Sequence, residues 1–300
     1  MAARFEAVAL GDQSPRLLAA LDEALDEIEL AERRLSRFLP ESEVSELNAV
    51  ASSRPVKVSP GLFNILKVCA GVWQASGGLF DVTVGPLVDV WNTSRKAGVI
   101  PSEDQLQQAL QVVGFNRIQA DELGRRIHFT TQGVRLDLGA VGKGYALNMA
   151  ARTLLDCGVD CGLIHGGTST VVALEAPEPE SGWKIEIAGP EDYPGTIGMI
   201  SLKNQALSVS AVHGRSFMHQ GRRLGHVIDP RTGRPVSGAL VAAVVAGDAL
   251  LADALSTALL AMGPEGMEKL RAAFPNAEFL CGYEENGTLQ VHADSCFVLA

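Results

Sequence analysis

The pattern of apolar and polar positions divides the first part of the chain into helices with clear start signals. A serine followed by proline opens an amphipathic stretch at residues 14–35 and another at 59–78, which ends in two glycines. The serine can cap a helix while the proline fits its first turn. Ser102 and Gln105 have the spacing of a capping box, and Gly114 supplies a stop. The pattern therefore predicts a helix in each of these stretches.

Residues 134–261 carry apolar runs that we expect to alternate between strands and helices. The run at 239–246 predicts a buried strand, and the run at 251–263 predicts a helix closed by glycine. This helix is apolar on nearly every face, which is typical of a core helix. Glycine and aspartate residues interrupt the apolar region around both runs, so we do not expect it to span a membrane.

The composition of the 300-residue chain fits one compact enzyme. With 47% apolar residues, a chain of this length can bury about 75% of its unfolded surface. The 25 basic and 35 acidic residues give a net charge of −10, and no basic run is present to follow a nucleic-acid backbone. The five cysteines are odd in number and widely spread, so we expect them to be reduced. The first residues contain neither a long apolar stretch nor an early cysteine for lipidation, which predicts a cytoplasmic protein.

Residues 226–235 combine one histidine, one aspartate and two arginines with residues that fix a turn. The apolar residues 227–228 predict a short strand that would hold His226 rigidly, and the following Asp-Pro and Thr-Gly pairs predict a tight turn. Taken alone, the segment is also compatible with a hairpin turn that carries an incidental histidine. Asp229 is expected to cap the turn or to orient Arg231.

Residues 136–146 run from an apolar start through several glycines and Lys143 into a helical pattern. Backbone N–H groups at the helix start and the Lys143 ammonium would both point at an anion, an arrangement that the helix dipole supports. The loop is not a Walker A motif, because Asp137 replaces its first glycine and Gly144 follows the lysine. A glycine-rich turn with a solvated lysine is the alternative interpretation of this segment.

Asp253 and Thr257 lie inside the predicted core helix. Residues four apart share a helix face, so the carboxylate and the hydroxyl would converge on one point. Such a pair also occurs by chance on solvent-facing helices, but a buried carboxylate is costly unless a cation or hydrogen bonds compensate it. Mg²⁺ binds oxygen ligands and usually takes one or two protein carboxylates together with substrate phosphates. The pair therefore predicts a magnesium site.

Several stretches are similar, in order, to the motifs of one known family. They have the forms S-x-F-x-x-x-S-x-x-x-x-x-N, G-x-F-D-x-T-V-x-P-L-x-x-x-W, D-L-G-x-x-x-K-G-Y-A, H-x-I-D-P-x-T-G-x-P and A-D-A-L-S-T. They occupy residues 35–48, 77–91, 137–146, 226–235 and 252–257. Through these stretches the chain resembles the FAD:protein FMN transferases of the ApbE family over almost its whole length.

The resemblance implies one α+β domain over residues 1–300, with mixed and antiparallel sheets flanked by helices and an FAD cleft between two halves. It implies that FMN is transferred from FAD, with the help of Mg²⁺, to a threonine or serine hydroxyl of an acceptor flavoprotein, while AMP leaves. A backbone carbonyl near Ala140 would complete the metal ligands Asp253 and Thr257. Lys143 would neutralise charge during phosphoryl transfer, and His226, whose imidazole titrates near neutral pH, would act as general base.

The residues expected to bind FAD come from these motifs and from neighbouring segments. They are Phe38, Asn48, Asp81, Lys143, Gly166, Gly167, Ser210, His226 and Asp229.

Four positions depart from the family pattern. Ile164 and Thr168 replace the asparagine and the aspartate of an N-x-G-G-D segment. Ala211 and His213 replace the glycine and the tyrosine of a T-S-G-x-Y segment, whose serine is kept as Ser210. These changes remove polar groups from the expected nucleotide side of the cleft. Two alternatives therefore stay open, namely an FAD pyrophosphatase that releases FMN and AMP, and a non-catalytic FAD-binding protein.

Other classes of hydrolase are not supported. The sequence His-Gly-Gly at 165–167 is similar to an esterase oxyanion loop, but the chain has no G-x-S-x-G elbow. The histidines outside these motifs are scattered and form no zinc-like cluster with cysteine; they are His128, His213, His219 and His292.

Overall fold

The structure, a computed structural model, describes residues 3–11, 14–212, 217–219 and 222–300. Its helices are α1 (Pro15–Leu35), α2 (Glu43–Val50), α3 (Pro60–Ala75), α4 (Gly85–Lys96), α5 (Glu103–Leu110), α6 (Gly142–Asp156), α7 (Ala249–Met262) and α8 (Gly266–Ala273). Its strands are β1 (Phe5–Ala9), β2 (Val56–Lys57), β3 (Ile118–Asp121), β4 (Arg126–Phe129), β5 (Gly162–Gly166), β6 (Thr170–Ala173), β7 (Trp183–Ala188), β8 (Thr196–Leu202), β9 (Gln205–Ala211), β10 (Phe217–His219), β11 (Arg222–Leu224), β12 (Val241–Ala246), β13 (Glu278–Glu285), β14 (Thr288–Ala293) and β15 (Val298–Leu299).

A seven-stranded sheet with the order β1-β5-β6-β9-β12-β13-β14 forms the centre of the molecule, and its neighbouring strands pair antiparallel. Strand β12 is buried along its whole length. Because side chains alternate across a strand, Ala242 and Val244 pack toward the helices, while Val241 and Ala243 pack toward the small sheet of β7, β8 and β15. The α+β class that the sequence predicts is confirmed.

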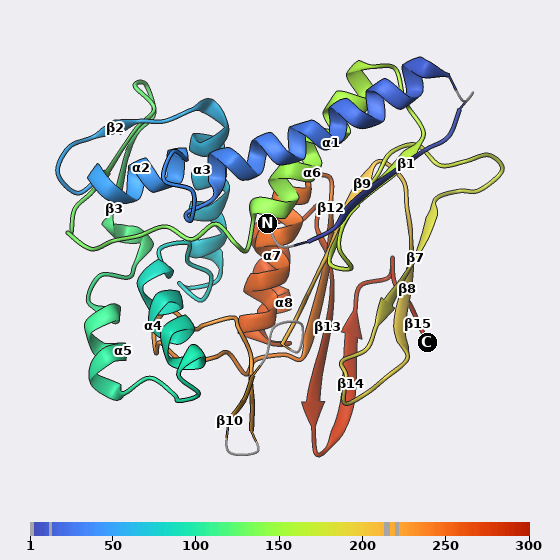
Figure 1. Cartoon of the computed structure of the whole chain (residues 1–300). Helices are drawn as coiled ribbons and strands as arrows, with labels where there is room; N and C mark the ends of the chain where they lie inside the picture. Colours follow the sequence, from blue (N-terminus) through green and yellow to red (C-terminus); the bar gives the residue numbers. More distant parts are fainter. Residues whose placement is uncertain (1–2, 12–13, 213–216, 220–221) are drawn as a thin grey trace.

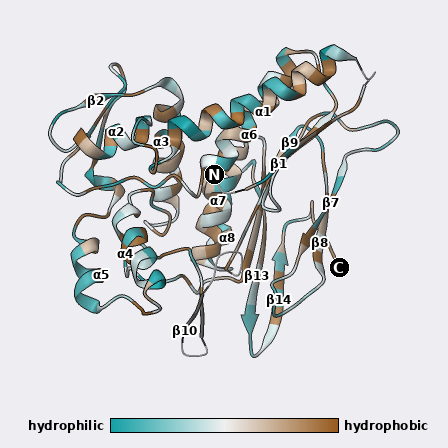
Figure 2. Cartoon of the chain, viewed as in Figure 1, coloured by the Kyte–Doolittle hydropathy of each residue, from teal (hydrophilic) through white to brown (hydrophobic). Residues whose placement is uncertain are grey.

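Helices α1, α6, α7 and α8 lie on the face of the seven-stranded sheet opposite to the small sheet. Helices α2, α3, α4 and α5 form a second group beside them (Figure 1). Helix α7 packs on β9 and β12 and is covered in turn by α3 and α6, so it is buried on nearly every face. Helix α1 packs along α6. Hydrophilic and hydrophobic residues alternate along α1, as expected for a helix with one face on the core (Figure 2).

The predicted helix starts are confirmed, whereas two other expectations are wrong. Serine side chains cap α1 and α3, and Ser102 and Gln105 form the capping box of α5. That helix ends at Leu110, four residues before Gly114, whose positive φ instead belongs to the turn that follows. Residues 134–261 do not alternate, since the described segments between α6 and α7 contain strands alone. Short antiparallel strands need no crossover helix, which explains the difference.

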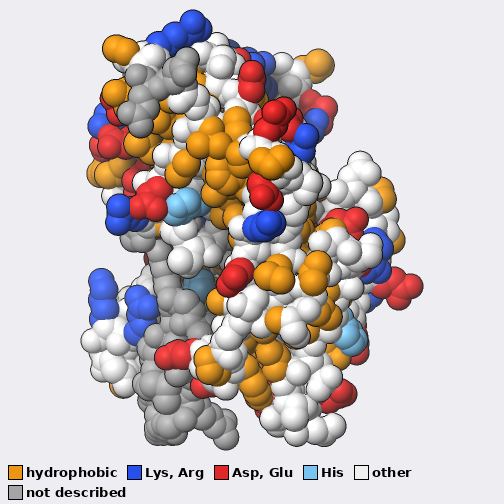
Figure 3. Space-filling model, turned by 90° about the vertical axis from the view of Figure 1, so that its right-hand side faces the viewer, with side chains coloured by type: hydrophobic (Ala, Val, Ile, Leu, Met, Phe, Trp, Pro, Cys, Tyr) orange, Lys and Arg blue, Asp and Glu red, His pale blue; other side chains and the backbone are white. Residues whose placement is uncertain are grey.

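Two features of the described residues concern apolar helices and surface charge. No described helix is long and apolar enough to cross a membrane. On the face turned toward the viewer in Figure 3, basic side chains lie in small groups among acidic and apolar ones. All five cysteines are free thiols, as predicted.

Candidate functional site

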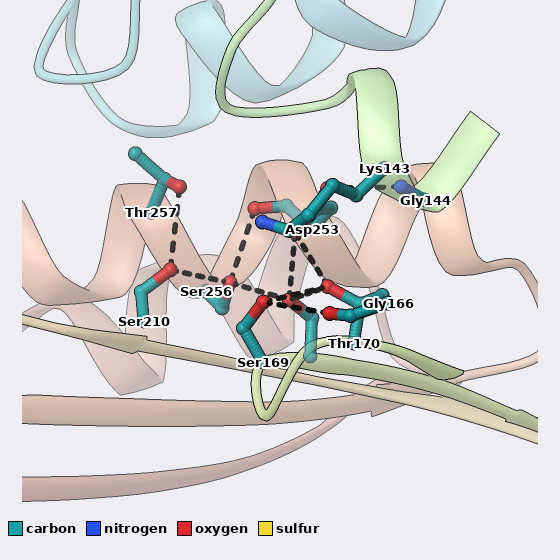
Figure 4. Close-up of polar contacts among 10 residues, drawn as sticks. Lys143, Gly144, Gly166, Ser169, Thr170, Ser210, Asp253, Ser256 and Thr257 are labelled. Carbon is teal, nitrogen blue, oxygen red and sulfur yellow. Dashed lines mark hydrogen bonds and ion pairs between the residues drawn. The ribbon is translucent and has the colours of Figure 1, made fainter. Parts of the chain in front are cut away.

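The candidate site lies where α7 meets β6, β9 and the start of α6 (Figure 4). Asp253 on α7 is 3% exposed. Its Oδ1 accepts hydrogen bonds from Thr170 Oγ1 at 3.2 Å and from Ser208 Oγ at 2.8 Å. Its Oδ2 accepts one from the backbone N–H of Gly144 at 3.0 Å. Donors from three distant parts of the chain thus compensate the burial of this carboxylate.

The start of α6 contributes both a charge and a close backbone contact. Lys143 Nζ lies 3.8 Å from Asp253 Oδ1, and the lysine side chain is 24% exposed. A Cβ at Gly144 would lie 2.1 Å from the carbonyl oxygen of Ala249. Glycine is therefore required for the starts of α6 and α7 to approach this closely. The Gly144 N–H, which the sequence offers to an external anion, here binds the carboxylate of the protein itself.

Hydroxyl groups extend the site from Asp253 toward Thr257. Ser256 Oγ lies 3.2 Å from Ser208 Oγ, and Ser210 Oγ lies 2.9 Å from Ser256 Oγ. Thr257 Oγ1 lies 3.4 Å from Ser210 Oγ. Ser208 and Ser256 are fully buried, whereas Ser210 and Thr257 are half-buried. The two residues predicted as metal ligands are therefore linked through the serines of β9 and α7.

The donors at this site fit Mg²⁺ and do not fit zinc. In the part of the chain that the structure describes, no group of three or more His, Cys, Asp or Glu side chains could hold a metal ion. Asp253 Oδ2 accepts one hydrogen bond among the described residues, which leaves a lone pair for a cation. The predicted ligands Asp253, Thr257 and Ala140, the last in the turn before α6, offer a carboxylate, a hydroxyl and a backbone carbonyl. Mg²⁺ prefers oxygen donors of this kind, and the ligand set stays a prediction.

His226 does not precede a strand, although its sequence pattern predicts one at 227–228. It lies in a bend after β11 and is exposed. The short strand expected at 227–228 is wrong, because Ile228 makes a single bridge with Pro235. His226 instead lines a shallow hollow against α4, together with Val88, Trp91, Asn92, Arg95, Gly225 and Ile228.

The turn after His226 is built as predicted. Asp229 Oδ1 accepts hydrogen bonds from Arg231 N at 2.8 Å and Arg231 Nε at 3.1 Å, and Oδ2 accepts one from Arg231 Nη2 at 3.0 Å. The side-chain bonds to Asp229 raise the pKa of the Arg231 guanidinium above its ordinary value. Trp91 Nε1 donates to the carbonyl of Gly233 at 2.7 Å, which attaches the turn to α4. Asp229 therefore caps the turn and orients Arg231, with no contact that requires a ligand.

Two candidate flavin-binding residues near the start of the chain differ in their surroundings. Asn48 donates through Nδ2 to the carbonyl of Leu136 at 3.1 Å and accepts from its N–H at 2.7 Å, so it holds the 136–146 loop. Phe38 is 74% exposed, and the guanidinium of Arg37 lies 5.0 Å from its ring centroid. Such an exposed aromatic ring is available for stacking on a planar ligand.

Asp81 is engaged inside the protein. It is 7% exposed and accepts hydrogen bonds from Thr83 N at 2.8 Å, Thr83 Oγ1 at 2.6 Å and Phe115 N at 2.7 Å. Burial raises the pKa of its carboxyl, and the hydrogen bonds from Thr83 and Phe115 oppose that shift. One oxygen thus stabilises the turn before α4, and the other binds the segment that begins at Phe115. The role of Asp81 in binding FAD stays a prediction.

The glycine pair at 166–167 forms a turn that leads from β5 into β6. Gly167 has a φ of +63°, which favours glycine, and its N–H donates to the carbonyl of Arg4 at 2.8 Å. His165 contacts the carbonyl of Gly167 through Nδ1 at 3.0 Å and the carboxylate of Glu6 through Nε2 at 3.0 Å. The turn places Thr170 beside Asp253.

The departures from the family pattern lie outside the Asp253 site. Ile164 is fully buried in the cluster formed with α1 and α6. Ala211 packs on the face of the sheet opposite to the helices, whereas Ser210 faces α7. Thr168 is exposed at the turn. These three residues are not among the donors to Asp253, and His213, the fourth departure, lies outside the described residues.

Sequence reasoning missed the residues that hold Asp253 and the loop before α6. Thr170, Ser208 and Ser256 were not selected, although the period of two in β9 puts Ser208 on the same face as Ser210. Arg37 was missed as well, and its 9% exposed side chain pairs with Asp89 and, at 3.2 Å, with Asp137. Of the scattered histidines, His213 and the side chain of His219 lie outside the described residues.

Comparison with known proteins agrees with this architecture. A sequence profile of the ApbE family matches residues 1–280. An FAD:protein FMN transferase from Klebsiella pneumoniae is 28% identical over 81% of this chain and 71% of its own length. One from Rhodobacter capsulatus is 32% identical over 77% of this chain and 44% of its own length, so the chain spans less than half of that relative.

A solved structure shows the same fold. The flavin transferase ApbE from Vibrio cholerae superposes with a TM-score of 0.84 and 23% sequence identity, covering 99% of this chain and 95% of that chain. The fold and the site thus define an α+β protein with a buried carboxylate that hydroxyl and backbone N–H donors hold in place. Because the family profile covers almost all of the sequence, the chain belongs to the ApbE family.

Proposed function

We propose that this protein is an FAD:protein FMN transferase that moves FMN from FAD to a threonine or serine hydroxyl of an acceptor flavoprotein and releases AMP. Membership of the ApbE family and the names of its relatives support the transferase class. The observation that carries the proposal is the buried Asp253, with Lys143 at 3.8 Å and the Thr257 hydroxyl one helical turn away. Phosphoryl transfer depends mainly on such positioning and charge neutralisation.

Asp253, Thr257 and the carbonyl of Ala140 would hold Mg²⁺, which when bound would neutralise charge on the FAD pyrophosphate. Lys143, partly exposed beside Asp253, would bind a phosphate oxygen and stabilise the charge that develops during transfer. The acceptor hydroxyl oxygen forms the new bond to the FMN phosphorus, and the bond from that phosphorus to the bridging oxygen breaks. AMP leaves with the bridging oxygen.

His226 would take the proton of the acceptor hydroxyl. A hydroxyl is a weak nucleophile near neutral pH, and an imidazole is suited to remove its proton in the transition state. The exposed position of His226 beside the α4 hollow makes it accessible to a second protein. Phe38, Asn48, Asp81, Gly166, Gly167, Ser210 and Asp229 are proposed to shape or support the FAD cleft. The cytoplasmic location inferred from the sequence stays a prediction, which cell fractionation tests.

The decisive experiment mixes the purified protein with FAD, Mg²⁺ and an acceptor domain that carries a candidate threonine, and follows AMP release together with the mass of the acceptor. An FMN-sized mass gain with equal AMP supports transfer. Free FMN with AMP would show an FAD pyrophosphatase instead, and bound FAD without AMP would show a binding protein.

A pair of variants in α7 tests the role of Asp253. Asp253→Asn keeps the size of the side chain, and its amide can face the hydroxyls of Thr170 and Ser208, so we expect a folded protein that lacks the negative charge. Asp248→Asn is the matched control, because Asp248 caps the same helix and asparagine caps equally well. We expect Asp253→Asn to lose transfer and Mg²⁺ dependence, while Asp248→Asn keeps both. Equal activity in the two variants would refute the proposed site.

A further inference from the structure

The hydroxyl groups between Asp253 and Thr257 form one continuous chain of hydrogen bonds. From the carboxylate outward, the chain passes through Ser208, Ser256 and Ser210 to Thr257, with oxygen separations of 2.8, 3.2, 2.9 and 3.4 Å. It runs from a fully buried end to a half-buried one. Its members alternate between β9 and α7, so the packing of the helix on the sheet assembles it.

Counting protons shows one arrangement in which every hydroxyl of the chain donates toward Asp253. Each hydroxyl has one proton to donate, whereas a carboxylate only accepts. Ser208 therefore gives its proton to Asp253. Ser256 has two acceptors on that side, Ser208 Oγ at 3.2 Å and the backbone carbonyl of Asp253 at 3.1 Å, and its proton is used on one of them.

In this arrangement the remaining hydroxyls follow the same direction, which the separations allow because either oxygen of each pair can donate. Because the proton of Ser256 points toward Asp253, Ser256 accepts at 2.9 Å from Ser210. Because the proton of Ser210 is used there, Ser210 accepts at 3.4 Å from Thr257. In this arrangement the proton of Thr257 points at Ser210, and the lone pairs of its Oγ1 point away from that proton.

We propose that Ser210, with Ser256 behind it, is a positioning residue that turns the Thr257 hydroxyl so that its lone pairs face the bound cation. The inference rests on the proposed function, since it assumes that Asp253 and Thr257 hold Mg²⁺. Without the chain the Thr257 hydroxyl would rotate freely and would present its proton to the cation part of the time. The acceptors at Asp253, its carboxylate and its backbone carbonyl, thus orient a second ligand through the serines.

The test is Mn²⁺ binding in the presence of FAD and without acceptor, followed by electron paramagnetic resonance of the free ion. Ser210→Thr and Ser210→Val are nearly equal in shape and differ in the hydroxyl, so they form a matched pair. One neutral hydrogen bond corresponds to about fivefold in affinity, and we expect Ser210→Val to weaken Mn²⁺ binding by about that factor while Ser210→Thr binds normally. Ser256→Ala is expected to behave like Ser210→Val.

A double-mutant comparison separates this role from a merely structural one. If Ser210 acts through Thr257, the effect of Ser210→Val disappears when Thr257 is already replaced by valine. An equal effect in both backgrounds, or equal weakening by Ser210→Thr, would overturn the inference. Normal Mn²⁺ binding by Ser210→Val together with weak binding by Thr257→Val would overturn it while leaving the metal site intact. Normal binding by Thr257→Val would overturn the metal site as well.

Discussion

Gly144→Ala tests the close contact between the starts of α6 and α7. The added Cβ would lie 2.1 Å from the carbonyl oxygen of Ala249, 2.6 Å from its carbonyl carbon and 2.8 Å from the nitrogen of Leu250. These are backbone atoms at the beginning of α7 and cannot rotate aside as a flexible side chain would. The two helices must therefore move apart.

The expected cost follows from this geometry. Overpacking of a core costs roughly 1–3 kcal/mol, and contact with backbone atoms puts this site at the upper end. The movement also stretches the 3.0 Å bond from Gly144 N to Asp253. The small gain in helix propensity from alanine does not offset these effects. We expect a loss of about 3 kcal/mol in the free energy of unfolding, which lowers Tm by roughly 5–10 °C.

Gly71→Ala is the matched control, since Gly71 also lies within a helix. It is exposed on α3, and the nearest atom to an added Cβ is Phe274 Cζ at 3.8 Å, an ordinary contact. Alanine should stabilise this position by about 0.5–1 kcal/mol through helix propensity. Urea and thermal denaturation of both variants measure the difference. A Gly144→Ala protein as stable as Gly71→Ala would refute the close approach of α6 and α7.

Three further predictions concern charge. Lys143→Met should lower the rate of AMP release by about a hundredfold, the scale of one lost electrostatic contact to a transition state. Lys143→Arg should keep more activity. An unchanged rate for Lys143→Met would contradict the role of Lys143 in charge neutralisation. Arg37→Met should lower the free energy of unfolding, measured in urea, by about 3 kcal/mol, because Asp137 loses a buried partner. Arg33→Met, which removes an exposed ion pair, should change it little. Similar losses in the two variants would refute the difference between the buried and the exposed pair. Burial raises the pKa of Cys281 from 9.0 to about 12, so the stabilising preference for the neutral thiol is complete below pH 9 and is lost as the pH rises toward 12. The difference in stability between wild type and Cys281→Ala should therefore shrink by about 2 kcal/mol between about pH 9 and 11 in chemical denaturation, and a constant difference would count against it.

The sequence determined those features that depend on residues close together along the chain. Capping serines lie within one turn of the N–H groups that they bind, so the starts of α1, α3 and α5 could be predicted. The turn at 229–233 depends on an aspartate, a proline and a glycine that are near neighbours. The shared face of Asp253 and Thr257 follows from helical spacing alone. The family motifs added the fold class.

Tertiary structure decided which of these local pieces meet. The donors to Asp253 come from Gly144, Thr170 and Ser208, which lie 109, 83 and 45 residues away in the sequence. Their meeting depends on strand order and on a helix approach that leaves no room for a Cβ at Gly144. Neither is encoded in a local periodicity.

The errors have the same physical origin. The apolar runs in 134–261 fit buried strands as well as helices, and antiparallel pairing with distant strands selected the former. Residues 227–228 had the composition of a strand, but their pairing with 234–236 is a single bridge, with bonds from Val236 N to the carbonyl of Val227 and from Asp229 N to the carbonyl of Arg234. His226, just before it, lies in an exposed bend beside α4. A strand exists only where another strand satisfies its hydrogen bonds, and that partner is supplied by the folded chain.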